Sequence, residues 1–208
     1  MFSSWYNYFL EKLGFGTPIE ILLIGPENSG KKCLKHRLTE IDLHFNYSSG
    51  VDPYRRYHNK KTWMIQINRT KYKINENEDM QDVKSRINWL GAESFLRNCK
   101  GIIYLVDACD RNMISKAKEE LIVIQNDENL KNLPILILGN KIDKSNALTM
   151  AQLMDELGIS ANKTEENTAE ATAKDNKSPI IVSMCSIANM QGYSRGLTLL
   201  HEHIQNSR

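Results

Sequence analysis

Apolar runs alternate along the chain with segments whose apolar residues recur at helical spacing. Four continuous apolar runs predict strands that are buried on both faces: Ile19–Ile24, Gly101–Asp107, Leu133–Gly139 and Pro179–Met184. Helical patterns follow these runs, first up to about Leu38 and then at Ile114–Gln125, Met150–Leu157 and Gly196–Ile204. Because parallel strands buried on both faces are joined by helices, this alternation predicts an α/β fold with a doubly wound, mainly parallel sheet.

Three further segments have weaker patterns. Apolar residues alternate with polar ones in Lys61–Ile74, which predicts a half-buried strand. Met80–Asn98 has helical spacing, and we expect a helix there. Ser160–Ser178 has no apolar residue except alanine, so we expect a polar surface loop.

The first residues of the chain carry an aromatic-rich helical face. Its members recur at helical spacing: Phe2, Trp5, Tyr6, Phe9, Leu10 and Leu13. A Gly-Phe-Gly-Thr-Pro run then ends the helix. We therefore divide the chain into an N-terminal amphipathic helix with its linker, residues 1–16, and a single domain, residues 17–208. The helix either lies in a membrane interface or docks in a groove on a protein partner, and the residues favour neither.

Length and charge exclude several function classes. The 208 residues carry 27 Lys and Arg against 25 Asp and Glu, so a nucleic-acid partner is not expected. No apolar run approaches the ~18 residues that cross a bilayer. A basic run over residues 55–73 holds seven Lys and Arg and no acid. A surface for nucleic acid or anionic lipid is one interpretation of this run, and a solvated hairpin is the favoured one.

The four cysteines form neither a metal-binding nor a disulfide pattern. They include no CxxC pair and have no regular spacing: Cys33, Cys99, Cys109 and Cys185. We expect them to be buried, reduced thiols of a cytosolic protein, and we predict no metal site.

A glycine-rich segment lies between the first strand and the helix that follows it. Gly25 and Gly30 permit a tight turn whose backbone N–H groups would point at phosphate oxygens, and the amino end of the helix adds partial positive charge. Lys31 would reach the β- and γ-phosphates of a nucleotide. The residues expected to contact the nucleotide here are Gly25, Glu27, Asn28, Ser29, Gly30, Lys31, Lys32 and Cys33.

Two loops carry the candidate base-recognition residues. The sequence Asn-Lys-Ile-Asp follows the third buried strand, and the carboxylate of Asp143 can accept hydrogen bonds from both N–H groups on the guanine edge. The stem of Lys141 can lie on the base, and Asn140 would tie this loop to the phosphate loop. Ser186 and Ile187, after the last strand, would close over guanine, with a backbone N–H meeting its carbonyl oxygen.

These motifs, in this order at three strand ends, resemble those of the Arf/Sar small GTPases, and the Sar branch most closely. The resemblance is strongest in three segments: GIIYLVDACD (101–110), LPILILGNKIDK (133–144) and MCSIANMQGY (184–193). It implies a P-loop small GTPase fold, or G-domain, that binds guanine nucleotide and Mg²⁺. It also implies an N-terminal helix that enters the endoplasmic reticulum membrane, and coat, exchange-factor and activator partners in COPII vesicle transport between the endoplasmic reticulum and the Golgi.

The chain departs from this family where the family binds Mg²⁺ and the γ-phosphate. Lys32 stands where the phosphate loop has a Ser or Thr that ligates Mg²⁺. The resemblance implies an Asp-x-x-Gly in the second switch and then a water-orienting His. The best-spaced candidate begins at Asp82, but Ser85 stands where the motif has Gly, and Arg86 stands where it has His. Residues 43–62 also lack the Pro-Thr of the first switch. Three elements of metal-dependent hydrolysis are therefore missing together.

These departures leave three hypotheses. The leading one is a Sar-like pseudo-GTPase that binds GTP or GDP, has no catalytic residue or metal ligand that we can name, and acts as an interaction or structural subunit. The second is an active, divergent Sar-type switch in COPII transport, with Mg²⁺ held by other ligands. The third is a nucleotide-free architectural subunit of a large assembly. We expect the chain on the cytoplasmic side, either peripheral on the endoplasmic reticulum or held in such an assembly.

Overall fold

The computed structural model describes residues 19–45, 62–67, 70–76, 99–159, 170–174 and 179–206. The described residues form seven strands: β1 (Ile19–Ile24), β2 (Thr62–Ile67), β3 (Thr70–Glu76), β4 (Cys99–Asp107), β5 (Ile135–Asn140), β6 (Glu170–Lys174) and β7 (Pro179–Met184). They also form four helices: α2 (Lys31–Phe45), α5 (Arg111–Asn126), α6 (Met150–Leu157) and α7 (Tyr193–Asn206).

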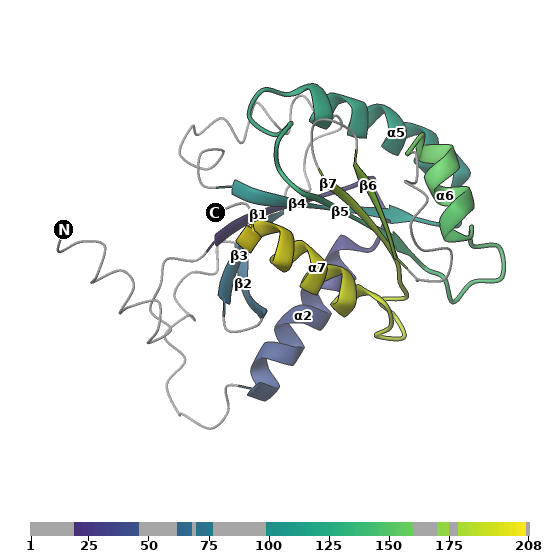
Figure 1. Ribbon diagram of the computed structural model, residues 1–208. Coiled ribbons are helices and arrows are strands. Elements are labelled where there is room, and N and C mark those ends of the chain that lie inside the picture. Colours follow the sequence, from purple (N-terminus) through teal and green to yellow (C-terminus); the bar gives the residue numbers. More distant parts are fainter. Residues whose placement is uncertain are drawn as a thin grey trace.

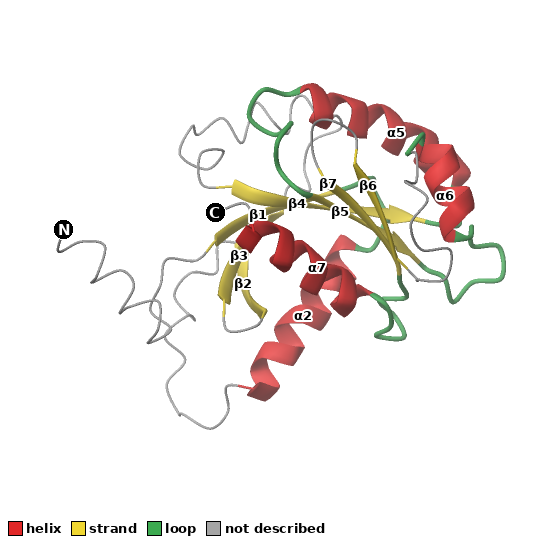
Figure 2. Cartoon of the chain, viewed as in Figure 1, coloured by secondary structure: helices red, strands yellow, loops and turns green. Residues whose placement is uncertain are grey.

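The strands form one sheet in the order β2-β3-β1-β4-β5-β7-β6. The five strands from β3 to β7 in this order are parallel, and the edge strands β2 and β6 each pair antiparallel with their neighbour. Helices α2 and α7 cover one face of the sheet, and α5 and α6 cover the other (Figures 1 and 2). The predicted doubly wound, mainly parallel α/β fold is confirmed.

The parallel strands are apolar on both faces because helices cover each face. In β1, Leu22 and Ile24 belong to the core that includes residues of α5 and α6. Ile21 and Leu23 belong to the core that includes residues of α2 and α7. All four side chains are at most 1% exposed. A strand whose two faces are both buried therefore has a continuous apolar sequence, with no alternation.

Most predicted element bounds agree with the structure to within a few residues, and β1, α6 and β7 match. Helix α2 continues past Leu38 to Phe45, and no glycine or proline lies between them to end it earlier. Helix α7 begins at Tyr193 instead of at Gly196. Gly196 lies inside the helix at a close approach to the sheet, where an added Cβ would lie 2.9 Å from Leu136 Cδ1.

The predicted single strand over Lys61–Ile74 is wrong. This segment contributes to two antiparallel strands, β2 and β3, in which Ile65 pairs with Tyr72 and Ile67 pairs with Thr70. Strand β3 lies against β1, which offers six residues for pairing. The chain therefore turns back and adds a second strand to the sheet, where the sequence pattern predicted one long strand. Alternation alone does not reveal where a strand reverses.

The predicted loop over Ser160–Ser178 is wrong in part, because Glu170–Lys174 forms the edge strand β6. It pairs antiparallel with β7 along its whole length. Backbone hydrogen bonds to a single neighbour hold an edge strand in place, so Ala and Thr suffice as its side chains. Such a strand leaves no hydrophobic signal in the sequence.

Several predictions fall on residues outside the described ranges. They are the helix and linker over residues 1–16, the helix over Met80–Asn98, the second-switch candidate at Asp82–Arg86 and the first-switch residues 46–61. The expectations attached to them, including the membrane or partner contact of the N-terminal helix, stay predictions. None of the helices that the structure describes is both long and apolar enough to span a membrane.

The cysteines divide into two groups. Cys99 and Cys185 are buried, as predicted, and burial raises the pKa of each thiol to about 12. Cys33 is exposed and Cys109 is half-buried, so the prediction of buried thiols is wrong for these two. Cys33 precedes Leu34, which faces the core, and neighbouring positions on a helix face different directions.

A buried hydrogen bond between β4 and α5 provides a test of the core. Tyr104 Oη donates to Glu120 Oε2 at 2.7 Å, and both side chains are at most 5% exposed. Tyr104→Phe removes the donor and leaves the carboxylate without it, so we expect the free energy of unfolding to fall by about 1–3 kcal/mol. Urea denaturation measures the change. Glu119→Gln, on the exposed side of the same helix, is the control, and equal stability of both variants would contradict the prediction.

Candidate functional site

Loops at the carboxyl ends of the parallel strands come together along one edge of the sheet. They follow β1, β4, β5 and β7, and hydrogen bonds join each of them to a neighbour. In doubly wound folds this edge is where ligands bind. The predicted phosphate and base residues lie in three of these loops and in the ends of the elements that they join, so the fold brings together what the sequence separates by more than 100 positions.

The loop after β1 makes a turn that its two glycines permit. Gly25 has φ of 148° and Gly30 has φ of 109°, both in the region that favours glycine. A Cβ on Gly25 would overlap the carbonyl oxygen of Leu105, and one on Gly30 would overlap the side-chain amide of Asn140. The Gly30 carbonyl accepts from the N–H of Leu34 at 2.9 Å and so begins α2. A tight turn at two glycines that leads directly into a helix is the arrangement found in phosphate-binding loops.

Positive charge collects where this loop meets α2. Lys31 Nζ donates to the carbonyl oxygens of Gly25, at 2.7 Å, and Pro26, at 2.8 Å, which holds the ammonium against the loop. The first turn of α2 contains no acidic residue. The helix dipole adds partial positive charge at the same end. This arrangement suits the phosphates of a nucleotide.

Asn140 ties three loops together. Its Nδ2 donates to the carbonyl oxygen of Ser29 at 2.8 Å, and its Oδ1 accepts from the N–H of Ile187 at 3.1 Å. Its backbone carbonyl accepts from the N–H of Ala108 at 2.9 Å. The side chain is buried, with the residue 4% exposed. The predicted tie between Asn140 and the phosphate loop is confirmed, and the structure adds the links to Ile187 and Ala108.

Asp143 is held by a serine of the loop after β7. Ser186 Oγ donates to Asp143 Oδ1 at 2.5 Å and accepts from the N–H of Asn189 at 3.2 Å. The hydrogen bond from Ser186 is the main cause that lowers the pKa of Asp143 below its ordinary value. The carboxylate is exposed and ionised at neutral pH, so it can accept the pair of N–H groups on the guanine edge.

Lys141 pairs with an aspartate that the sequence analysis did not select. Its Nζ lies 2.6 Å from Asp107 Oδ2, at the end of β4. The other oxygen of Asp107 accepts from the N–H of Cys109 at 2.9 Å. The sequence did offer a signal for Asp107, because it is an acidic residue at the carboxyl end of a buried apolar strand. A residue in that position lies beside the loops that follow the neighbouring strands.

The backbone N–H groups of the loop after β7 donate to acceptors within the protein. The N–H of Cys185 donates to Gly139, that of Ser186 to Gln191, and that of Ile187 to Asn140. The predicted contact between this loop and the guanine carbonyl oxygen stays a prediction. Any such contact from Ile187 would be shared with the side chain of Asn140.

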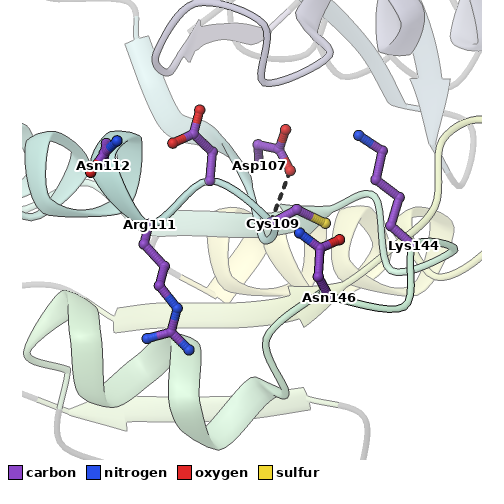
Figure 3. A pocket seen from close by; sticks show the side chains of 7 residues that line it. Asp107, Cys109, Arg111, Asn112, Lys144 and Asn146 are labelled. Atoms are coloured by element: carbon purple, nitrogen blue, oxygen red, sulfur yellow. Dashed lines mark hydrogen bonds between the residues drawn. The ribbon is translucent and has the colours of Figure 1, made fainter.

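A shallow pocket of about 430 Å³ lies beside the base-recognition loop (Figure 3). Its lining is polar and comes from the loops after β4 and β5 and from the start of α5: Asp107, Cys109, Asp110, Arg111, Asn112, Lys144 and Asn146. Figure 3 shows the hydrogen bond from the Cys109 backbone to Asp107, two of the residues that line the pocket. The pocket borders the site and holds none of its predicted nucleotide contacts.

Among the described residues, the phosphate loop and the start of α2 do not fit the Mg²⁺ ion that the family resemblance implies. Lys32, exposed in the first turn of α2, stands where a hydroxyl ligand is needed, and an ammonium has no lone pair to offer a metal. Within the described ranges, no group of three or more His, Cys, Asp or Glu is placed to hold a metal ion. The described start of α2 therefore lacks the hydroxyl ligand that Mg²⁺ needs beside the phosphate loop.

Comparisons with known proteins agree with this geometry. Residues 6–204 match the ADP-ribosylation factor family. ADP-ribosylation factor-like protein 8c of Arabidopsis thaliana is 29% identical, over 76% of this chain and 79% of that protein. The small COPII coat GTPase SAR1 of Giardia intestinalis is 24% identical, over 98% of this chain and 99% of that protein. The structure of the Arl6 BBS3 small GTPase from Trypanosoma brucei has the same fold, with a TM-score of 0.65 and 17% identity over 92% of this chain and 100% of that one.

The tie made by Asn140 predicts a joint loss of stability and binding. Asn140→Ala leaves the Ser29 carbonyl and the Ile187 N–H without their partner, so the free energy of unfolding should fall by about 1–3 kcal/mol. Affinity for GDP should fall more than about tenfold, because the two loops lose their common anchor. Urea denaturation and fluorescent-nucleotide titration measure the two effects. Asn146→Ala, at an exposed position six residues later, is the control, and matching behaviour of the two variants would sink the prediction.

The hydrogen bond from Ser186 predicts a pH effect. Asp143 has a lowered pKa in the folded protein, so its ionised form persists as pH falls until that lowered pKa is reached. Ser186→Ala removes the main cause, so the pKa should rise toward its ordinary value of 3.8 and protonation should begin at higher pH. Carboxyl ¹³C NMR of Asp143 follows the titration. Ser145→Ala is the control on the same loop, and an unchanged midpoint in Ser186→Ala would contradict the assignment.

Proposed function

Because the chain belongs to the ADP-ribosylation factor family of small GTPases, we propose that it binds guanine nucleotide without Mg²⁺ and hydrolyses GTP little or not at all. The observation that carries this proposal is Lys32, next to a phosphate loop whose turn is otherwise complete. Base recognition supports the binding half of the proposal, since Asn140 and Asp143 are both held by hydrogen bonds.

Electrostatics explains why Lys32 and Mg²⁺ exclude each other. Two unit charges ~4 Å apart interact by about 4 kcal/mol at an effective dielectric of ~20, and a divalent ion about doubles this repulsion. The same ammonium attracts phosphate oxygens. Lys31, Lys32 and the amino end of α2 would together neutralise the phosphates, which is the part of the work that the metal does in related sites.

Hydrolysis needs more than neutral phosphates. Phosphoryl transfer depends on a positioned water and on charge stabilisation at the γ-phosphate. The second-switch segment lacks the Asp-x-x-Gly and the following His, and the first-switch segment lacks the Pro-Thr, that would supply these groups. A bound nucleotide would therefore serve as a long-lived structural ligand, and the protein would act as an interaction or structural subunit.

The cellular setting follows from the relatives as a proposal. One of them is named a small COPII coat GTPase, and the match to it extends over nearly the whole of both chains. We propose protein partners that contact the switch-like surfaces and the N-terminal helix. We also propose a place on the cytoplasmic side, either peripheral on the endoplasmic reticulum or held in a large assembly.

Nucleotide content tests the proposal directly. The protein is purified gently with and without a chelator and then denatured, and the released nucleotide is identified by chromatography. We expect guanine nucleotide near one equivalent, retained with the chelator. GDP that is lost on chelation would instead support an active, Mg²⁺-dependent switch. No nucleotide at all would support a purely architectural subunit.

Restoring the hydroxyl tests the role of Lys32 itself. Lys32→Thr should make GDP affinity depend on Mg²⁺, by about tenfold or more between chelator and millimolar Mg²⁺, because the variant regains a ligand and loses the repulsion. Isothermal titration with and without the ion measures this. Lys35→Thr removes the same charge one turn later on α2 and should stay independent of Mg²⁺. A wild type that already responds to Mg²⁺ would overturn the proposal.

A further inference from the structure

The loop after β4 holds the base-recognition loop at several points. The Ala108 N–H donates to the Asn140 carbonyl at 2.9 Å, and the Cys109 thiol lies 3.5 Å from the Lys141 carbonyl. The side chain of Asp107 adds the ion pair with Lys141. These contacts come from three consecutive residues, and all of them end on Asn140 or Lys141. Residues 107–109 therefore hold the start of the base-recognition loop in place.

Lys141 needs this support because of its backbone. Its φ is 71°, in the left-handed region that residues with a side chain adopt with difficulty. Such a conformation persists where surrounding contacts over-determine it. The ammonium of Lys141 is held at 2.6 Å from a carboxylate whose side chain is 12% exposed. The ion pair thus holds the side chain of Lys141 in place while its backbone is strained.

The ion pair also decides what Lys141 can offer a nucleotide. Its charge is already matched by Asp107, so it does not serve as a further cation for the phosphates. What remains is the aliphatic stem, which joins the loop backbone to the ammonium beside Asp107. The direction of that stem is set at both ends, by the backbone and by Asp107.

We propose that Asp107 is a positioning residue for guanine selectivity. By fixing Lys141, it keeps the strained loop in the conformation that places Asp143, two residues later, where it can accept from the guanine edge. The inference rests on the proposed guanine binding. Asp107 touches no nucleotide itself in this scheme, and Figure 3 shows it beside Cys109, among the residues that line the neighbouring pocket.

Inosine nucleotides test selectivity separately from affinity. Inosine lacks the exocyclic amino group that donates to Asp143, so the ratio of the IDP and GDP dissociation constants reports how well that carboxylate is placed. Asp107→Asn keeps the side-chain size and an oxygen for the Cys109 N–H, but it removes the charge that holds Lys141. We expect this ratio to fall at least about threefold, as a recognition group loses its position.

The matched control is Glu20→Gln. Glu20 also pairs with a lysine, Lys73, at 3.0 Å, and its side chain is 15% exposed, but it lies near the start of β1, away from the nucleotide loops. Both variants lose one half-buried ion pair and should lose some thermal stability. The IDP to GDP ratio should change in Asp107→Asn and stay at the wild-type value in Glu20→Gln. A change of stability with an unchanged ratio in Asp107→Asn would overturn the inference.

A double-mutant cycle shows whether Asp107 acts through Lys141. Lys141→Met keeps an apolar stem and removes the ammonium. If Asp107 acts by holding that ammonium, Asp107→Asn should lower the ratio in the wild-type background and leave it unchanged in the Lys141→Met background. Equal effects in both backgrounds would overturn the route through Lys141.

The outcomes separate this inference from the proposed function. If the wild-type chain binds neither GDP nor IDP, the proposed function fails and the inference fails with it. If the wild type binds GDP better than IDP and the ratio survives in Asp107→Asn, the inference alone fails. If the ratio falls as expected while nucleotide binding proves to need Mg²⁺, the inference stands and the metal-free part of the proposed function fails.

Discussion

The buried amide of Asn140 is the interaction on which the rest of the site depends. A single side chain donates to the phosphate loop and accepts from the loop after β7, and its own backbone accepts from the loop after β4. Each of these partners is a backbone group that would otherwise be buried without a hydrogen bond, which is costly in a protein interior. The phosphate loop and the base-recognition loops are therefore one mechanical unit, and neither can shift alone.

Two charge arrangements divide this unit into halves. At the base half, two charged groups are held by partners: Asp143 by Ser186, and Lys141 by Asp107. At the phosphate half, cationic groups collect without an acidic residue in the first turn of α2. The base half thus holds its charged groups in fixed positions suited to recognise a base, and the phosphate half offers positive charge to an anion. The substitution at Lys32 fits this division, since it removes the metal ligand without disturbing the turn that Gly25 and Gly30 build.

Most of the fold could be predicted because burial leaves a plain mark on the parallel strands. β1, β4, β5 and β7 lie between two helical layers, so their central residues are mostly apolar on both faces. The edge strands carry no such mark: β6 is held by backbone pairing to β7. Edge strand β2 and its neighbour β3 give one continuous alternating pattern in the sequence, because alternation does not show where a strand reverses. The glycine at position 196 predicts a helix boundary, whereas α7 continues through it, and its packing against Leu136 exists only in the assembled core.

The sequence by itself determined the family likeness, the phosphate loop, the pair Asn140 and Asp143, and the loss of the metal-binding hydroxyl at Lys32. These follow from residue types at short spacings, which local chemistry fixes. Only the tertiary structure decided that Asp107 pairs with Lys141, that Ser186 holds Asp143, and that Asn140 also binds Ile187 and Ala108. Those partners are 32 or more positions apart, and only the parallel order of the sheet brings the carboxyl ends of their strands together.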